Sequence, residues 1–266
     1  MGKAETSQKK VGIAFTVLLV VVWTAWFRVQ TVHGAQAQPF YLERGLYEHQ
    51  VSGALSMFKK EVVARRSDGT TALIEYEGLN KLPGGTGLPA MRKLTFPDGS
   101  EVWLVDQFHL RSSWPKMNSA GAVNVVARVS HPKPNCGMSE SAVLGHDNVA
   151  GQQTLRTVIK IDATREVMSW LAPDLACEML TFQQVTTDGT PAKVLTEGRV
   201  LMFSTGEPDP ELFTIRGDYE EVVPSQLITR RLGAVGIEMD EDTRRMGSQM
   251  DRQIRRGAAL PEKNDK

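Results

Sequence analysis

Segments rich in β-branched and aromatic residues alternate with short polar turns along most of the chain. Asp-Gly pairs occupy three of these turns, at 68–69, 98–99 and 188–189. Because Asp-Gly readily adopts the positive φ angles of a tight turn, each pair predicts a β-hairpin. The strands that these hairpins join are expected at 61–66 with 71–76, at 92–96 with 101–108, and at 178–186 with 192–203.

Polar and apolar residues also alternate in a segment that turns at residues 162–165. Leu155 and Ile159 would share one face of its first strand, with Lys160 on the other face. Such alternation is typical of an antiparallel sheet with one buried and one wet face. The remaining strands are therefore expected at 154–161 and 166–171, as a fourth hairpin, and at 122–129.

The predicted fold class is mainly β, with one domain over residues 40–224. Roughly nine strands in series with short turns predict an antiparallel meander that forms a curved sheet or open barrel, or splits into a sandwich. Loosely helical spacing of Leu42, Leu46, Val51 and Leu55 predicts one short helix within residues 41–60.

A helical tail is expected at residues 225–256, which lack proline and place apolar residues at helical spacing beside several arginines. This C-terminal helix could cover one end of the sheet, or its basic face could contact a membrane or a partner protein. Residues 257–266 are polar and are expected to form a disordered end.

Residues 1–37 have the parts of an export signal. Two lysines at 9–10 precede an uncharged run of 17 residues at 11–27, and Ala35-Gln36-Ala37 follows. This pattern predicts a targeting helix that is either a signal peptide cleaved after Ala37 or an uncleaved signal anchor. Both alternatives place the domain outside the cytoplasm, in the periplasm or extracellular, with membrane contact through residues 11–27 if the signal is uncleaved.

Composition fits a packed globular protein, with 41% hydrophobic and 23% charged residues. The formal net charge of the whole chain is zero. Without residues 1–37 the chain has 27 basic and 30 acidic residues, a net charge of −3. Nothing in this balance favours nucleic acid as a partner.

Cys136 and Cys177 are the only cysteines. In an exported chain such a pair is expected to form a disulfide bond, which would stabilise the fold by up to about 4 kcal/mol on the chain-entropy model. The alternative is a metal site that adds His131 and His146 to the two cysteines. That spacing matches no compact zinc-ligand pattern, so no metal site is predicted.

Motifs of catalysis and cofactor binding are missing from the sequence. There is no G-x-S-x-G elbow and no H-E-x-x-H helix, and the glycine-rich segment 81–89 lacks the Lys and Ser or Thr of a phosphate-binding loop. The sequence therefore predicts no catalytic residue and no cofactor. Trp103, Trp114 and Trp170 are expected in the core or at its rim rather than in a ligand cage.

One stretch resembles a known group of proteins. Residues 206–215 (GEPDPELFTI) and 218–222 (DYEEV) resemble the closing motif of uncharacterised secreted bacterial proteins of acidobacterial type, although Arg216 stands where proline is usual. The segments 64–69 and 170–175 are similar to that group as well. In strand layout such proteins look like periplasmic lipoprotein carriers, whose curved half-barrel sheet holds acyl chains against a helix. The resemblance implies a fold, and it transfers no activity.

Three functional classes remain open. The leading hypothesis is a non-enzymatic protein of the cell envelope that binds a lipid, another apolar ligand or an envelope protein, which predicts a concave apolar pocket with few charges. The alternative is a secreted hydrolase with a scattered active site, which predicts convergent Asp, Glu or His with shifted pKa values. A third is an interaction protein that uses the arginine-bearing tail.

Overall fold

The computed structural model describes residues 38–49, 55–77, 90–114, 135–187 and 193–234, and residues 241, 244–245, 247–249 and 251–252 of the tail. The export signal with Ala37, the glycine-rich segment 81–89, the expected strand 122–129 and the C-terminal end 257–266 lie outside the described residues. The Asp-Gly turn at 188–189 does too. None of the described helices is long and apolar enough to cross a membrane.

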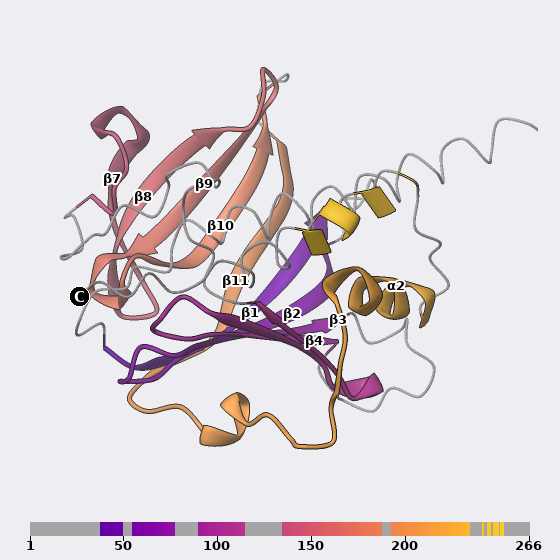
Figure 1. Ribbon diagram of the computed structural model, residues 1–266. Helices are drawn as coiled ribbons and strands as arrows, with labels where there is room; N and C mark the ends of the chain where they lie inside the picture. The colour runs from indigo at the N-terminus through magenta and orange to yellow at the C-terminus, as the bar shows by residue number, and fades with distance from the viewer. Residues whose placement is uncertain are drawn as a thin grey trace, which may run out of the picture.

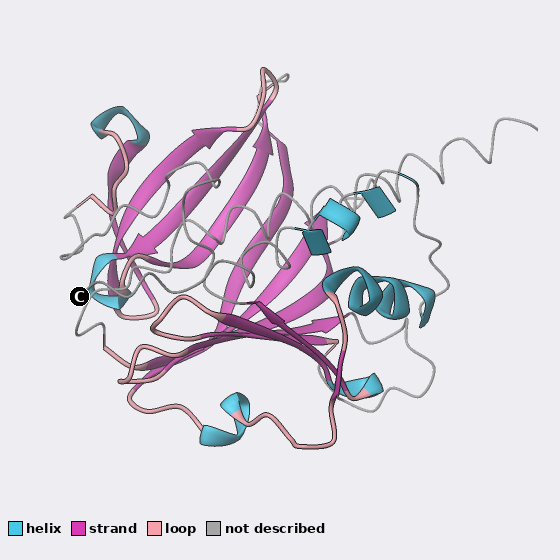
Figure 2. Ribbon diagram, viewed as in Figure 1, coloured by secondary structure: helices cyan, strands magenta, loops and turns pink. Residues whose placement is uncertain are grey.

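The described residues form one sheet of twelve strands (Figures 1 and 2). The strand order is β12-β6-β5-β4-β3-β2-β1-β11-β10-β9-β8-β7, and neighbours are antiparallel except for β12, which is parallel to β6. The predicted antiparallel, curved and open sheet is therefore confirmed. The strands are β1 (Phe40–His49), β2 (Leu55–Arg65), β3 (Thr71–Glu77), β4 (Met91–Thr95), β5 (Glu101–Val105), β6 (Leu110–Trp114), β7 (Val143–Val149), β8 (Gln152–Lys160), β9 (Arg165–Ala172), β10 (Glu178–Thr186), β11 (Lys193–Thr205) and β12 (Glu220–Glu221).

Two meanders make up this sheet. Strands β1 to β6 form the first arm and β7 to β11 form the second, and the two arms join where β1 pairs with β11. The arms meet at an angle, so that the sheet has an inner and an outer face (Figure 1). On the inner face, Val149 of β7 packs against a cluster that includes Phe40 of β1 and Val63 of β2. Strands at a distance in the sheet therefore meet through its curvature.

The predicted hairpins are confirmed where the structure describes them. In the β2–β3 and β4–β5 turns, Asp68 and Asp98 accept hydrogen bonds from the backbone of Thr70 and Ser100. The glycine that follows each aspartate has a positive φ, at +87° and +85°. In the β8–β9 turn, a hydrogen bond from Arg165 lowers the pKa of Asp162 to about 2. Strands β10 and β11 pair as expected.

The prediction of a helix within residues 41–60 is wrong for the described part of this segment, because β1 covers residues 41–49 and β2 covers residues 55–60. The inward positions of β1 alternate as a strand requires, but one of them is Arg44. In β2 the corresponding inward positions include Glu61 and Arg65, both buried. Charged residues at buried positions interrupt the alternation of apolar and polar residues that marks a strand. The apolar residues that remain are spaced by chance as in a helix.

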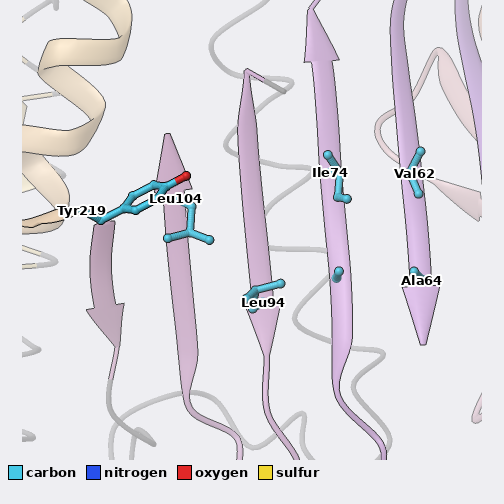
Figure 3. Close-up of a cluster of buried hydrophobic side chains, with 7 residues drawn as sticks. Val62, Ala64, Ile74, Leu94, Leu104 and Tyr219 are labelled. Atoms are coloured by element: carbon cyan, nitrogen blue, oxygen red, sulfur yellow. The ribbon is translucent and has the colours of Figure 1, made fainter. Parts of the chain in front are cut away.

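The outer face of the first arm is covered by residues 206–219, which we call the strap. The strap includes the 3-10 helix η4 (Pro210–Phe213), and its apolar side chains pack on a cluster shared by β2 to β5. Tyr219 lies beside Leu104 in this cluster (Figure 3). The segment 206–215 (GEPDPELFTI) therefore lies in this cover. The other labelled members are Val62, Ala64, Ile74 and Leu94.

Three polar residues from separate elements hold the strap. Arg92 of β4 donates two hydrogen bonds to Asp106 of the 3-10 helix η1 (Asp106–Phe108), at 2.7 and 2.6 Å. It also donates to the carbonyl oxygens of Leu212 and Thr214, at 3.3 and 3.0 Å. The Tyr219 hydroxyl donates to Asp106. The bonds to Leu212, Thr214 and Tyr219 therefore hold the strap against Arg92 and Asp106.

The helix α2 (Pro224–Ala234) lies on the opposite side of the first arm from the strap (Figure 1). Its Leu227 packs into an inner-face cluster with Met91, Val105 and Leu110. The rings of Trp103 and Trp114 stack in the same cluster, with their centroids 4.8 Å apart. The expectation that a C-terminal helix covers one end of the sheet is therefore confirmed.

The described residues between 241 and 252 are helical as well. Asp251 accepts hydrogen bonds from the backbone N–H and the hydroxyl of Ser225, at 3.1 and 2.5 Å. A carboxylate at this place satisfies one backbone donor of the first turn of α2 and suits the positive end of its dipole. The tail therefore caps α2.

Candidate functional site on the inner face of the sheet

The inner face carries many charged side chains, which differs from the expected apolar surface with few charges. Strand pairing aligns Arg44 with Glu61 and Glu61 with Glu75, so these side chains share one face. Lys59 and Arg65 occupy the same face of β2. The remaining members come from β4, β5, β10 and α2: Lys93, Glu101, Glu178 and Arg231.

Arg44 and Glu61 form a buried ion pair, with 0% and 2% of their side chains exposed. The Arg44 Nε donates to a Glu61 oxygen at 2.6 Å, and a second nitrogen contacts the same oxygen. Its remaining nitrogen donates to the carbonyl of Met179 in β10. Since β11 lies between β1 and β10, Arg44 crosses a whole strand and joins the two arms.

Gly198 allows this crossing. A Cβ atom at Gly198 would collide with the Phe182 ring and lie 3.1 Å from Cδ of Arg44. The register between β10 and β9 also shifts between Met179 and Thr181, which places a bulge at Leu180. A bulge disturbs the regular ladder and re-aims backbone groups, here beside the carbonyl that Arg44 reaches.

Glu178, at the start of β10, lies close to Arg44 and Glu61. Its side chain is half-buried, and its Oε1 accepts no hydrogen bond from the described residues. Burial raises the pKa of Glu178 to about 7, and the nearby Glu61 adds to the rise. Arg44 and Arg65 act in the opposite direction. We call Arg44, Glu61, Arg65 and Glu178 the charge cluster.

A second set of charges links the sheet to α2. Glu75 pairs with Lys59 at 2.8 Å and with Arg231 of α2 at 3.4 Å. Burial by itself would raise the pKa of Glu75, but Lys59 and Arg231 hold it below its ordinary value. Beside them, Lys93 pairs with Glu101 at 3.3 Å.

Positive charge is in slight excess among these described inner-face residues. They comprise five cations and four carboxylates, and the Glu178 carboxyl with a pKa of about 7 is only partly ionised near neutral pH. The inner face of the first arm can therefore receive an additional acidic group without a net excess of negative charge.

The inner face of the second arm is less polar. Ile159 of β8 pairs with Val167 of β9, and both are half-buried. Next to them lie buried hydroxyl and amide side chains, at Thr157, Ser169 and Gln184. Half-buried apolar groups among hydrogen-bonding groups are a common lining for small-molecule sites.

The predicted disulfide is present between Cys136 and Cys177, with Cα atoms 5.5 Å apart. It ties the turn before the 3-10 helix η2 (Glu140–Ala142) to the start of β10. Because the cysteines bond to each other, they do not form the alternative metal site, and His131 lies outside the described residues. No group of three or more His, Cys, Asp or Glu among the described residues could hold a metal ion.

The tryptophans lie where the sequence predicts. Trp103 and Trp114 are buried in the core, and Trp170 is a half-buried rim residue that donates to Asp147 at 2.8 Å. Sequence reasoning missed Arg44, Glu61 and Glu178. The only signal in the sequence was a charged residue at an inward position of an otherwise regular strand alternation.

No protein family model matches this sequence, and no curated protein matches it. Solved structures with a similar arrangement of strands include an uncharacterized conserved protein from Thermus thermophilus, with a TM-score of 0.41 and 10% identity, over 75% of this chain and 98% of that chain. The MucA/MucB complex of Pseudomonas aeruginosa matches with a TM-score of 0.37 and 15% identity, over 75% of this chain and 62% of that chain.

The similar structures also include a LolA superfamily protein from Nitrosomonas europaea, with a TM-score of 0.29 and 9% identity, over 70% of this chain and 94% of that chain. At these scores and identities, the likeness assigns no ligand, partner or activity to this chain.

Proposed function

We propose that this protein is a non-enzymatic, binding or carrier-type β domain of the cell envelope. Residues 1–37 export it, either as a cleaved signal or as an anchor. The inner face of the sheet holds an amphipathic ligand such as a lipid with an acidic head group. The disulfide supports the location, because such bonds persist in oxidising compartments outside the cytoplasm.

The composition of the inner face is the observation that carries this proposal. One arm presents half-buried apolar positions at Ile159 and Val167, and the other carries the slight excess of cations that includes the partly exposed Lys59, Lys93 and Arg231. An acyl chain needs apolar contacts, and an acidic head group is bound best by arginine and lysine. Both halves of an amphipathic molecule therefore find matching chemistry on one face.

Native mass spectrometry of protein purified from its own envelope tests the proposal. The wild-type protein is expected to carry a bound lipid. Ile159→Arg places a charge on the inner face and is expected to lower the fraction with lipid at least tenfold. Val158→Arg is the matched control, because Val158 is the adjacent half-buried residue of β8 and faces outward. It is expected to retain the lipid.

Two results would contradict the proposal. One is a mass without ligand for the wild-type protein, and the other is equal loss of lipid in both variants. Thermal unfolding of each variant checks that the fold survives the added arginine.

The alternative of a secreted hydrolase depends on Glu178. A carboxyl with a pKa of about 7 is suited to general acid-base catalysis. If the protein is a hydrolase, the wild type should cleave a member of a panel of esters, peptides and glycosides, and Glu178→Gln should not. Absence of cleavage by the wild type favours the binding function.

A further inference from the structure

The disulfide lies directly beside the charge cluster. Cys177 is buried and is followed by Glu178, the first residue of β10. The groups that face Glu178 come from two other strands: Arg44 from β1, and Glu61 and Arg65 from β2. The disulfide therefore fixes the backbone from which Glu178 enters the cluster.

The backbone before Glu178 has an unusual conformation. Ala176 and Cys177 are consecutive residues with positive φ angles, +58° and +64°, and Cys136 across the disulfide has a φ of +51°. For residues with a Cβ atom this left-handed region is strained, so it persists only where other contacts enforce it. Two backbone hydrogen bonds help to hold this conformation. The N–H of Ala176 donates to the carbonyl of Pro173, in the 3-10 helix η3 (Pro173–Leu175), at 3.1 Å, and the N–H of Cys177 donates to the carbonyl of the residue before that helix at 2.9 Å. The disulfide is the third constraint.

We propose that the Cys136–Cys177 disulfide is a redox latch that holds the Glu178 carboxyl in the charge cluster between the two arms of the sheet. Reduction allows Ala176 and Cys177 to leave the left-handed conformation, and Glu178 then moves toward solvent. The redox state of the cysteines and the proton bound to Glu178 are thereby coupled. This inference does not depend on the identity of any ligand.

The reaction is a thiol-disulfide exchange with a dithiol. A thiolate of the dithiol attacks the sulfur of Cys136, which is the less buried of the two cysteines, and Cys177 leaves as a thiolate. The second thiol of the reductant then closes its own disulfide and releases Cys136. Two electrons and two protons pass to the cysteines, and the dithiol is oxidised.

The coupling between the redox state of the cysteines and the proton on Glu178 has a definite sign. In the oxidised protein Glu178 keeps its proton up to a pH of about 7, whereas an exposed glutamate has lost it above a pH of about 4.5. Between these values, reduction releases one proton from Glu178 while the thiols take up two. By reciprocity, proton binding at Glu178 favours the disulfide, and the disulfide favours proton binding at Glu178.

The first test is the titration of Glu178 by carboxyl ¹³C NMR, with the protein oxidised and then reduced by dithiothreitol. The pKa of Glu178 is expected to fall from about 7 toward its ordinary 4.5 on reduction. The double variant Cys136→Ser/Cys177→Ser is expected to give the reduced value. An unchanged pKa overturns the proposal. Global unfolding on reduction overturns it too, because the bond would then stabilise the whole fold rather than latch one residue.

The second test is the reduction potential as a function of pH. Across pH 4.5 to 7 the wild-type protein takes up a net single proton per two electrons, so its potential should fall with half the slope of an uncoupled disulfide. Glu178→Gln should restore the full slope. Glu140→Gln is the matched control, since Glu140 is an exposed carboxylate near Cys136, and it should keep the half slope. A full slope in the wild type contradicts the coupling.

Discussion

Gly198 is a position where one methyl group should have a large effect. Its added Cβ would collide with the buried Phe182 ring and press on Arg44, so overpacking should lower the free energy of unfolding by roughly 1–3 kcal/mol. Urea denaturation of Gly198→Ala measures this loss. Gly217→Ala is the control, because no atom lies within 4 Å of its added Cβ, and it should unfold at the wild-type midpoint. Equal midpoints for the two variants would contradict the crossing of β11 by Arg44.

The buried Arg44–Glu61 pair gives a second prediction at this scale. Arg44→Met leaves Glu61 charged and buried, which should cost about 3–5 kcal/mol of stability. The double variant Arg44→Met/Glu61→Leu removes both charges and should recover much of the loss. Chemical denaturation of both variants checks which of them is the more stable. A double variant no more stable than Arg44→Met would show that Arg44 acts mainly through its bond to the Met179 carbonyl.

These same residues mark the limit of prediction for the candidate site. The disulfide and the core tryptophans follow from residue type and from the expected export of the chain, and both were predictable. Arg44 and the Met179 carbonyl are 135 positions apart, and their contact depends on one glycine and one bulge. A single sequence reports neither, because charged side chains are normally assigned to the wet face of a strand.

Among the elements, the strap is held by polar contacts that can be removed one at a time. Arg92→Lys cannot make the paired hydrogen bonds to Asp106 or reach both strap carbonyls, because lysine lacks the planar fork of arginine. Amide hydrogen exchange in residues 206–219 is expected to accelerate at least severalfold. Arg216→Lys, an exposed residue of the same segment, is the control and should leave exchange unchanged. Equal exchange rates in both variants would show that the apolar contacts alone hold the strap on the sheet.

Hairpins were predictable because their signals are local. An Asp-Gly pair and its flanking strands are close together in the sequence, and the turns at Asp68 and Asp98 form as expected. The pairing of β1 with β11 has no local signal, and neither does the parallel contact of β12 with β6. The sequence could therefore indicate a meander but not the order in which its two arms are joined.

For the whole molecule, Glu178 should make stability depend on pH. Its pKa is raised from 4.5 to about 7 in the folded state, so the folded protein binds this proton more tightly than the unfolded chain. The resulting stabilisation is complete below pH 4.5 and is lost as the pH rises through 7, a change of about 3 kcal/mol. The lowered pKa of Glu75 acts oppositely, and only as the pH falls below about 4.5.

Denaturation midpoints from about pH 5 to about pH 8 test this dependence. The wild-type protein should lose stability over this range, and Glu178→Gln should remain nearly flat and be the more stable protein at the alkaline end. Glu140→Gln should follow the wild type. If the wild type gained stability toward the alkaline end, the Glu178 carboxyl would have to be ionised and well paired.

The place of β1 in the sheet has a consequence for folding. It is the first strand in the described part of the chain, yet its partners are β2, which follows it directly, and β11, which ends at Thr205. A chain synthesised only through β10 would hold two separate meanders with β1 and β10 as bare edges. Contacts of such long sequence separation form slowly, and bare edges invite aggregation. A holding chaperone is therefore expected to act on these two edges until residues 193–205 arrive.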